Sequence, residues 1–195
     1  MLDRLANRSD SLVDFIHNRV PLSDADKSMV YQLCKVETFP RGHRLIQQDR
    51  TANRIYFIQQ GSARAYYIHE GKDVTSWIYP EGQLITSWTS FYTRTPSYEN
   101  VELTEDAQVM SLTYEELQKL YQQSPKMQEF GRVIVEDQLV FIDYFYKGFM
   151  FMSAKEKYDL LLSIFPDVTQ RVNLGHIATF LGITQGTLSR IRNQK

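Results

Sequence analysis

The last helix that the sequence predicts carries side chains able to read DNA bases. Its outward positions hold hydrogen-bond donors, with no acid and no large hydrophobe. An arginine such as Arg190 pairs with the O6 and N7 atoms of guanine, and a glutamine such as Gln185 pairs with adenine or a phosphate. Thr184, as the cap of this helix, would offer its hydroxyl and a backbone N–H to a phosphate. The candidate DNA-contacting residues are Thr184, Gln185, Gly186, Ser189, Arg190 and Arg192.

Charge is distributed unevenly along the chain. The segment 168–195 holds four Lys or Arg residues and no acid, whereas the rest holds 18 positive and 23 negative side chains, and the formal net charge is -1. A patch of one sign raises the local affinity for phosphate even in a neutral protein. The small positive tail therefore fits a nucleic-acid contact, although a solvated terminal helix would have the same composition.

The elements around these residues follow a helix-turn-helix pattern. Asn173 can cap a first helix, Gly182 supplies a turn with positive φ, and Thr184 can cap the second helix. Ala178 is small where the second helix must cross close to the first. Ile177 is a further inner position of the first helix, and the apolar residues expected to fill the wedge between the helices are Leu181, Ile183, Leu188 and Ile191. A generic helical hairpin is the alternative.

The preceding chain predicts two kinds of structure. Residues 1–37 have helical spacing, with Ser23 as a cap. Residues 38–113 alternate short apolar runs with turn signals, which indicates a β-sandwich or jelly roll. Strands are expected at 54–58, 63–69, 74–79, 101–104 and 108–112.

A long helix is expected to follow, opened by Pro125. Thr113 and Ser153 mark the starts of the neighbouring helices, each with a Glu three residues later. The apolar stripe of the long helix is wide, which suits packing on its own β-domain or, as we favour, pairing with a second copy. The stripe comprises Met127, Phe130, Val133, Ile134, Val140, Phe141, Phe145 and Phe149.

Composition excludes several classes of protein. The 195 residues are 43% hydrophobic and 23% charged, typical of a globular chain. The single cysteine, Cys34, excludes an internal disulfide and any multi-cysteine zinc or iron–sulfur site. Because the chain has no long apolar run and no signal-peptide pattern, we expect a cytoplasmic protein without a membrane span.

This layout resembles the Crp/Fnr superfamily of bacterial transcription regulators. The resemblance covers about Lys35 to Arg192, and its most specific segment is Thr187-Leu188-Ser189-Arg190-Ile191. That segment is similar to the family's recognition-helix core, in which the arginine contacts DNA. Further matching segments are Arg41-Gly42-His43 with Leu45-Ile46, Ile55 to Gly61, and Pro80-Glu81-Gly82. The resemblance implies homodimers that join through the long helix and bind twofold operators.

The family's cyclic-nucleotide cassette is altered in this sequence. Counted from Gly82, the family's Gly-Glu pair, which holds the ribose, falls on Thr86-Ser87. The Arg-Ser/Thr-Ala triplet, whose arginine pairs with the cyclic phosphate, falls on Ser97-Tyr98-Glu99. Arg94 is the one nearby arginine that could compensate. We therefore expect weak or absent cyclic AMP binding, and either another effector or a cavity filled by its own aromatic residues, Trp77, Trp88, Phe91, Tyr92 and Tyr98.

The sequence thus predicts an α+β fold with an N-terminal β-roll (jelly-roll, cyclic-nucleotide-binding-like) domain at 1–124. A long dimerisation helix at 125–152 and a helix-turn-helix at 153–195, lacking a full wing, complete it. No cupin-like His-x-His, P-loop or Ser/His/Asp arrangement occurs, so we expect no enzyme, no metal and no cofactor. The expected partners are DNA, a second copy of the chain and an unknown small-molecule effector. The alternative is a ligand-binding or protein-docking module with a vestigial helix-turn-helix.

Overall fold

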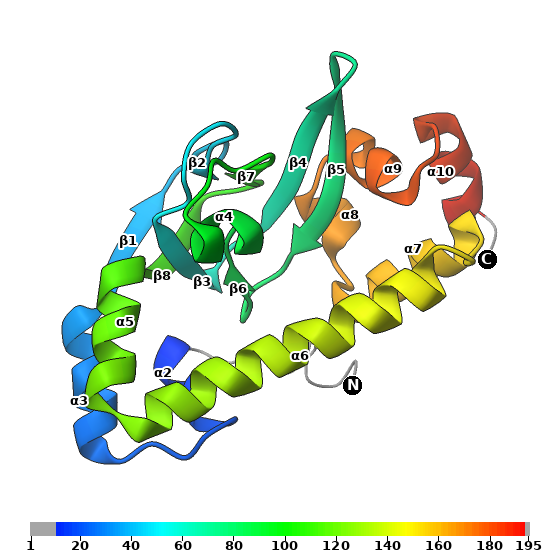
Figure 1. The fold of residues 1–195 in the computed structure, drawn as a ribbon. Helices are drawn as coiled ribbons and strands as arrows, with labels where there is room; N and C mark the ends of the chain where they lie inside the picture. The colour runs from blue at the N-terminus through cyan, green and yellow to red at the C-terminus, as the bar shows by residue number, and fades with distance from the viewer. Residues whose placement is uncertain (1–10, 194–195) are drawn as a thin grey trace.

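Antiparallel strands form two four-stranded sheets in a jelly-roll-like β-roll (Figure 1). The computed structural model describes residues 11–193. One sheet has the order β1-β8-β3-β6 and the other β2-β7-β4-β5. The bounds are β1 (Lys35–Phe39), β2 (Arg44–Ile46), β3 (Arg54–Gln60), β4 (Ala63–His69), β5 (Lys72–Tyr79), β6 (Leu84–Ile85), β7 (Asn100–Leu103) and β8 (Ala107–Thr113).

Local turn chemistry positions these strands. The β3–β4 turn passes through Gly61 with φ +99°, and a Cβ there would lie 2.6 Å from the Cβ of Ala107 on β8. Only glycine fits this close approach. The register of β3 on β8 shifts between Ile58 and Gln60, just before that turn. The β-roll core between the sheets includes the fully buried side chains of Phe57 and Leu103.

The helices begin where the sequence predicts caps. Ser23, Thr113 and Ser153 each form a capping box with an acidic residue three positions later, and Ser124 caps the long helix with Pro125 in its first turn. The helices are α2 (Leu12–His17), α3 (Asp24–Leu33), α4 (Trp88–Thr93), α5 (Tyr114–Gln123), α6 (Pro125–Phe149), α7 (Ala154–Ile164), α8 (Val168–Arg171), α9 (Leu174–Leu181) and α10 (Gln185–Asn193). No helix among the described residues is long and apolar enough to cross a membrane.

The expectation of helix throughout 1–37 is wrong at its C-terminal end. Helix α3 ends at Leu33, and residues 35–39 form strand β1. Strand β1 pairs with β8, from Lys35 opposite Ser111 to Phe39 opposite Ala107. These partners lie about 70 residues downstream, so local spacing carries no sign of them. Residues 1–10 of the predicted helical segment lie outside the described residues.

Helix α6 runs from the β-roll to the C-terminal helices (Figure 1) and contributes to the two buried cores. Its first half packs Met127, Phe130 and Ile134 into the core of the β-roll. Its second half brings Phe145 and Phe149 to the second core, which α7, α8, α9 and α10 build. The wide apolar stripe is therefore partly used within the chain.

Candidate functional site

Helices α9 and α10 form the predicted pair. The side chain of Asn173 caps α9, and Gly182 ends it at φ +70°. The N–H of Ile183 donates to the carbonyl of Ala178 (3.0 Å), which closes the turn. The N–H of Thr187 donates to Thr184 Oγ1 (3.2 Å), so Thr184 caps α10 as predicted. The buried side chains between the helices are Ile177, Ala178, Leu181, Leu188 and Ile191.

The outward face of α10 is fully open. All six candidate DNA-contacting residues, Thr184, Gln185, Gly186, Ser189, Arg190 and Arg192, are exposed. Arg190 Nη2 donates to Thr187 Oγ1 (3.3 Å), which directs the guanidinium along the helix. A Cβ at Gly186 would meet only Thr184 Oγ1 at 3.9 Å, so packing does not demand glycine there. The six exposed residues include no carboxylate, and all of them except Gly186 have side chains that can donate hydrogen bonds.

We expect Thr184→Ala to lower the free energy of unfolding by about 1 kcal/mol, because an orphan N–H of α10 loses its acceptor. In a chain of this size that loss lowers the melting temperature by about 2–4 °C. Thermal unfolding followed by circular dichroism measures it. Ser189→Ala, exposed within the same helix and without a cap role, is the control and should melt as the wild type does. Equal melting of Thr184→Ala would contradict the capping assignment.

The positive tail is smaller than its sequence suggests. Arg171, at the end of α8, contacts the carboxylates of Glu81, Glu105 and Asp167. Its charge is thereby used within the chain. Lys195 lies outside the described residues. Arg190 and Arg192 are the cations that α10 presents.

The cassette residues occupy the turn into α4 and the loop after it. Thr86 and Ser87 are buried, and Thr86 Oγ1 donates to the carbonyl of Arg54 (3.0 Å). Ser97 Oγ donates to the carbonyl of Glu99 (2.8 Å). The Ser87 hydroxyl has no partner at normal hydrogen-bond geometry, yet it lies close enough to lower the pKa of Glu99. The structure therefore brings Ser87 and Glu99 together.

Burial and neighbouring charge shift the pKa values of Glu99 and Tyr98. Burial raises the pKa of the Glu99 carboxyl, and the Ser87 hydroxyl offsets only part of that rise. Tyr98 is 64% exposed, and the Glu99 charge followed by burial raises the pKa of its phenol. An ionised carboxylate repels an anionic ligand rather than holding it.

We expect Glu99→Gln to raise the melting temperature at pH 7. A carboxyl whose pKa is raised on folding favours the folded state below its unfolded value of 4.5 and loses that contribution as the pH rises through its folded pKa. The gap between variant and wild type should therefore close as the pH falls below 4.5, where both side chains are neutral. Thermal unfolding across a pH series tests this. A variant that melts lower at pH 7 would show that the ionised carboxylate is stabilising.

The remaining predicted pocket residues are separated from this pair. Arg94 Nη1 donates to the carbonyls of Ala52 (3.0 Å) and Phe91 (3.1 Å), and its Nη2 donates to Asn53 Oδ1 (2.5 Å). Its guanidinium also lies over the ring of Tyr114. These bonds hold the loop after α4 and occupy the guanidinium that would have to replace the family's phosphate ligand.

Gly82 and Trp77 also lie elsewhere. Gly82 lines a cleft of about 460 Å³ between α2, the β5–β6 turn and α6, together with Phe15 and Phe141. Trp77 faces α6 and α9 and packs edge-on against Phe145 and other rings there. The predicted aromatic residues therefore do not line one common cavity. No cluster of His, Cys, Asp or Glu within residues 11–193 could hold a metal ion.

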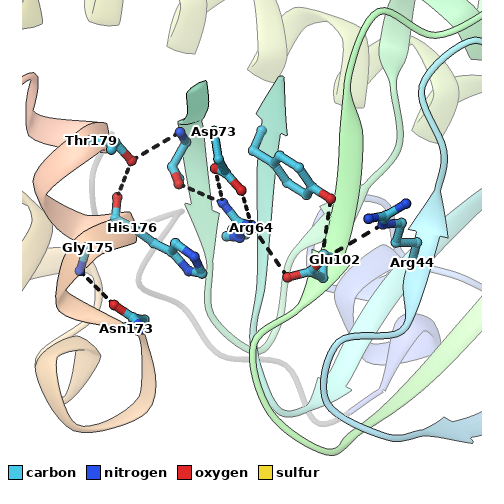
Figure 2. A network of polar contacts seen from close by, with 10 residues as sticks. Arg44, Arg64, Asp73, Glu102, Asn173, Gly175, His176 and Thr179 are labelled. Atoms are coloured by element: carbon cyan, nitrogen blue, oxygen red, sulfur yellow. Dashed lines mark hydrogen bonds and ion pairs between the residues drawn. The ribbon is translucent and has the colours of Figure 1, made fainter. Parts of the chain in front are cut away.

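A polar network that the sequence did not reveal covers the outer face of the second sheet (Figure 2). Arg64 on β4 is 3% exposed and forms a bidentate pair with Asp73 on β5 (2.6 and 2.7 Å). It also donates to Thr75 Oγ1 (3.1 Å), contacts Glu102 on β7 (3.5 Å) and stacks on the ring of Tyr66. Charge-assisted bidentate pairs of this kind fix side-chain orientation.

Helix α9 lies against this face. The N–H of Thr75 donates to Thr179 Oγ1 (3.2 Å), as Figure 2 shows. Phe180 packs edge-on against Trp77 at 5.5 Å between ring centres. His176 faces the Arg64 network, and burial followed by the Arg64 charge lowers the pKa of its imidazole. The first helix of the pair is thus docked on the β-roll, while α10 lies on the side away from it (Figure 1).

Comparisons with known proteins agree with this architecture. Residues 36–124 match the family model of the cyclic nucleotide-binding domain. A search of curated proteins finds no match. Solved structures share the fold at low identity. The catabolite activator protein of Thermus thermophilus is 17% identical over 92% of this chain and 85% of its own, with a TM-score of 0.58.

Two further structures cover both halves of the chain. FixK2 of Bradyrhizobium japonicum is 14% identical over 83% of each chain, with a TM-score of 0.67. A CooA mutant of Carboxydothermus hydrogenoformans is 17% identical over 97% of this chain and 86% of its own, with a TM-score of 0.64. The chain therefore combines a cyclic nucleotide-binding-like domain with the fold of Crp/Fnr-type regulators, as the resemblance in sequence implied.

Proposed function

We propose that this chain is a DNA-binding transcription regulator of the Crp/Fnr type. The observation that carries the proposal is the exposed, acid-free face of α10, with Arg190 at its centre. An α-helix of this kind fits the major groove, where arginine and glutamine distinguish base pairs. The regulator fold supports the same reading. We also propose that the protein is not an enzyme and that it acts in the cytoplasm.

We propose that two copies pair through α6. Val135, Leu139 and Ile142 on this helix are 50%, 66% and 58% exposed, although each is apolar. Their spacing of four and then three residues is that of a coiled-coil seam. In this arrangement residues 1–124 form the sensor domain, 125–152 the dimerisation helix and 153–195 the DNA-binding domain. A twofold dimer presents two α10 helices to a twofold operator.

We propose further that the cassette does not take cyclic AMP. Counted along the sequence, Glu99 falls in the triplet that carries the phosphate-binding arginine in the family, and Arg94 donates to three acceptors of the fold. In the altered cassette Ser97 takes the position of the bidentate arginine, and the Glu99 carboxyl lies two residues later, so a cyclic phosphate would lack the cation that neutralises it. An effector, if one acts here, is a small molecule of other chemistry.

Fluorescence anisotropy tests the proposal. A labelled duplex from upstream of the chain's own coding sequence is titrated at low and moderate salt, with and without cyclic AMP. We expect binding that weakens as salt rises, because phosphate contacts release counterions, and no change with cyclic AMP. An unrelated duplex of equal length is the control. Absence of binding under every condition would favour the protein-docking module, and a large gain with cyclic AMP would contradict the altered cassette.

A further inference from the structure

One of the contacts between the β-roll and the C-terminal helices is an arginine, Arg171, held between carboxylates. Arg171 Nε donates to Glu105 Oε1 (2.9 Å), and its Nη2 approaches the same oxygen (2.7 Å). Its Nη1 donates to Glu81 Oε2 (3.0 Å), and its Nη2 pairs with Glu81 Oε1. Asp167 on its own side of the interface lies at 3.4 Å. All three nitrogens of the guanidinium thus donate to carboxylates. The guanidinium also lies over the ring of Phe165.

Both carboxylates on the β-roll are held in place. Glu105, after β7, accepts a hydrogen bond from Ser62 Oγ (2.5 Å), and Glu81, in the β5–β6 turn, accepts one from the N–H of Gly61 (3.2 Å). Three turns of the β-roll therefore converge on Arg171. Burial raises the pKa of the Glu81 carboxyl, but the hydrogen bonds and charge of Arg171 together with backbone hydrogen bonds outweigh that rise. The pKa of Glu81 is therefore below its ordinary value. The carboxylate is ionised at neutral pH.

Arg171 is well placed to orient the DNA-reading helices. It ends α8 and lies two residues before Asn173, the cap of α9. The α9 contacts at Thr179 and Phe180 then align that helix along β5. Arg171 thus holds the chain just before α9, and the contacts of Thr179 and Phe180 hold α9 against β5, so both constrain where α10 lies.

We infer that Arg171 is a positioning residue that sets the half-site spacing read by the dimer. This inference rests on the proposed DNA-binding function. A dimer of helix-turn-helix units reads half-sites about 10–10.5 base pairs apart, or multiples of this, because two helices at a fixed separation must enter successive major grooves. Removal of Arg171 leaves like charges facing each other at the junction, which favours separation of the units. The half-site motif depends on α10 itself and stays the same.

Selection from a pool of random-sequence duplexes tests the inference, since the bound sequences report both motif and spacing. The variants are Arg171→Gln and, from the β-roll side, Glu81→Gln combined with Glu105→Gln. Lys155→Gln is the matched control, because it removes one positive charge from an exposed ion pair with Asp159 on α7. Urea unfolding shows whether each variant folds. If Arg171→Gln does not fold, the spacing distribution of the double variant decides the outcome.

We expect wild type and Lys155→Gln to enrich one inverted repeat with a single centre-to-centre spacing. Arg171→Gln and the double variant should enrich the same half-site over several spacings. An unchanged spacing distribution in folded variants would overturn the inference while leaving the proposed function intact. Loss of the half-site motif itself would show a merely structural role and would also overturn it. No enriched motif with wild type would instead refute the proposed function, and the inference with it.

Discussion

Arg190→Ala should weaken the preference of this protein for its operator over unrelated DNA. A guanidinium that donates to guanine O6 and N7 contributes about 1–3 kcal/mol of discrimination, which corresponds to a loss of roughly 5-fold to 160-fold in specific affinity. Binding to unrelated duplexes should fall far less, because the phosphate contacts remain. Fluorescence anisotropy on specific and unrelated duplexes of equal length measures both quantities.

The structure makes this variant easy to interpret. Arg190 is exposed. Within the described residues its side chain makes one hydrogen bond, to Thr187 Oγ1. Its removal should change the free energy of unfolding by less than about 0.5 kcal/mol. Arg50→Ala, an exposed arginine in the loop between β2 and β3, is the control for lost charge. Equal losses for both variants on both duplexes would remove Arg190 from the base-reading role.

Ile142→Asp should convert the dimer to a monomer and weaken operator binding about 100-fold or more. The substitution places a charge within the apolar seam on α6, whose partners in the dimer would be the same residues of a second copy. Two linked DNA-binding helices bind a two-half-site duplex about 10²-fold to 10⁴-fold more tightly than one helix does, so the monomer loses that factor in affinity. Sedimentation velocity gives the mass, and anisotropy gives the affinity for duplexes with one or two half-sites.

Tyr144→Asp is the matched control for this loss. Tyr144 is also an exposed apolar residue of α6, but it lies two positions after Ile142 and therefore on a different side of the helix. It should leave the protein dimeric. A dimeric Ile142→Asp protein would place the interface elsewhere. A monomeric protein with undiminished operator affinity would show that dimerisation is not needed for binding.

The C-terminal helices could be predicted from sequence because their signals are local. Asn173, Gly182 and Thr184 determine where α9 and α10 begin and end, and each acts on backbone atoms within five residues. The capping boxes at Thr113 and Ser153 are equally local. A side chain that satisfies nearby N–H groups leaves a readable pattern wherever it occurs.

Elements that depend on distant partners escaped prediction. Strand β6 has two residues and exists because it pairs with β3, and α4 forms in a run rich in aromatic and β-branched residues that favour strands. Tertiary packing overrides local propensity in both. Arg171 meets Glu81 and Glu105 across 90 and 66 residues, so no spacing in the sequence indicates the junction.

The candidate ligand set shows the same limit. The sequence could show which residues replace the family's cassette, but not how their side chains are used. Arg94 lies close in sequence to the expected phosphate position, yet its guanidinium bonds Ala52 and Asn53, some 40 residues earlier. The sequence places Trp77 in a strand, but it cannot show that its ring packs against α6 and α9, where the two cores meet.

Methylation interference on a bound duplex tests most directly the claim that α10 reads DNA. A duplex methylated sparsely at guanine N7 is mixed with the protein, and the bound and free fractions are cleaved and compared. Because Arg190 should donate to that nitrogen in the major groove, we predict interference at one guanine in each half-site, related by twofold symmetry. A bound fraction with uniform methylation, or no bound fraction with any duplex, would contradict the claim.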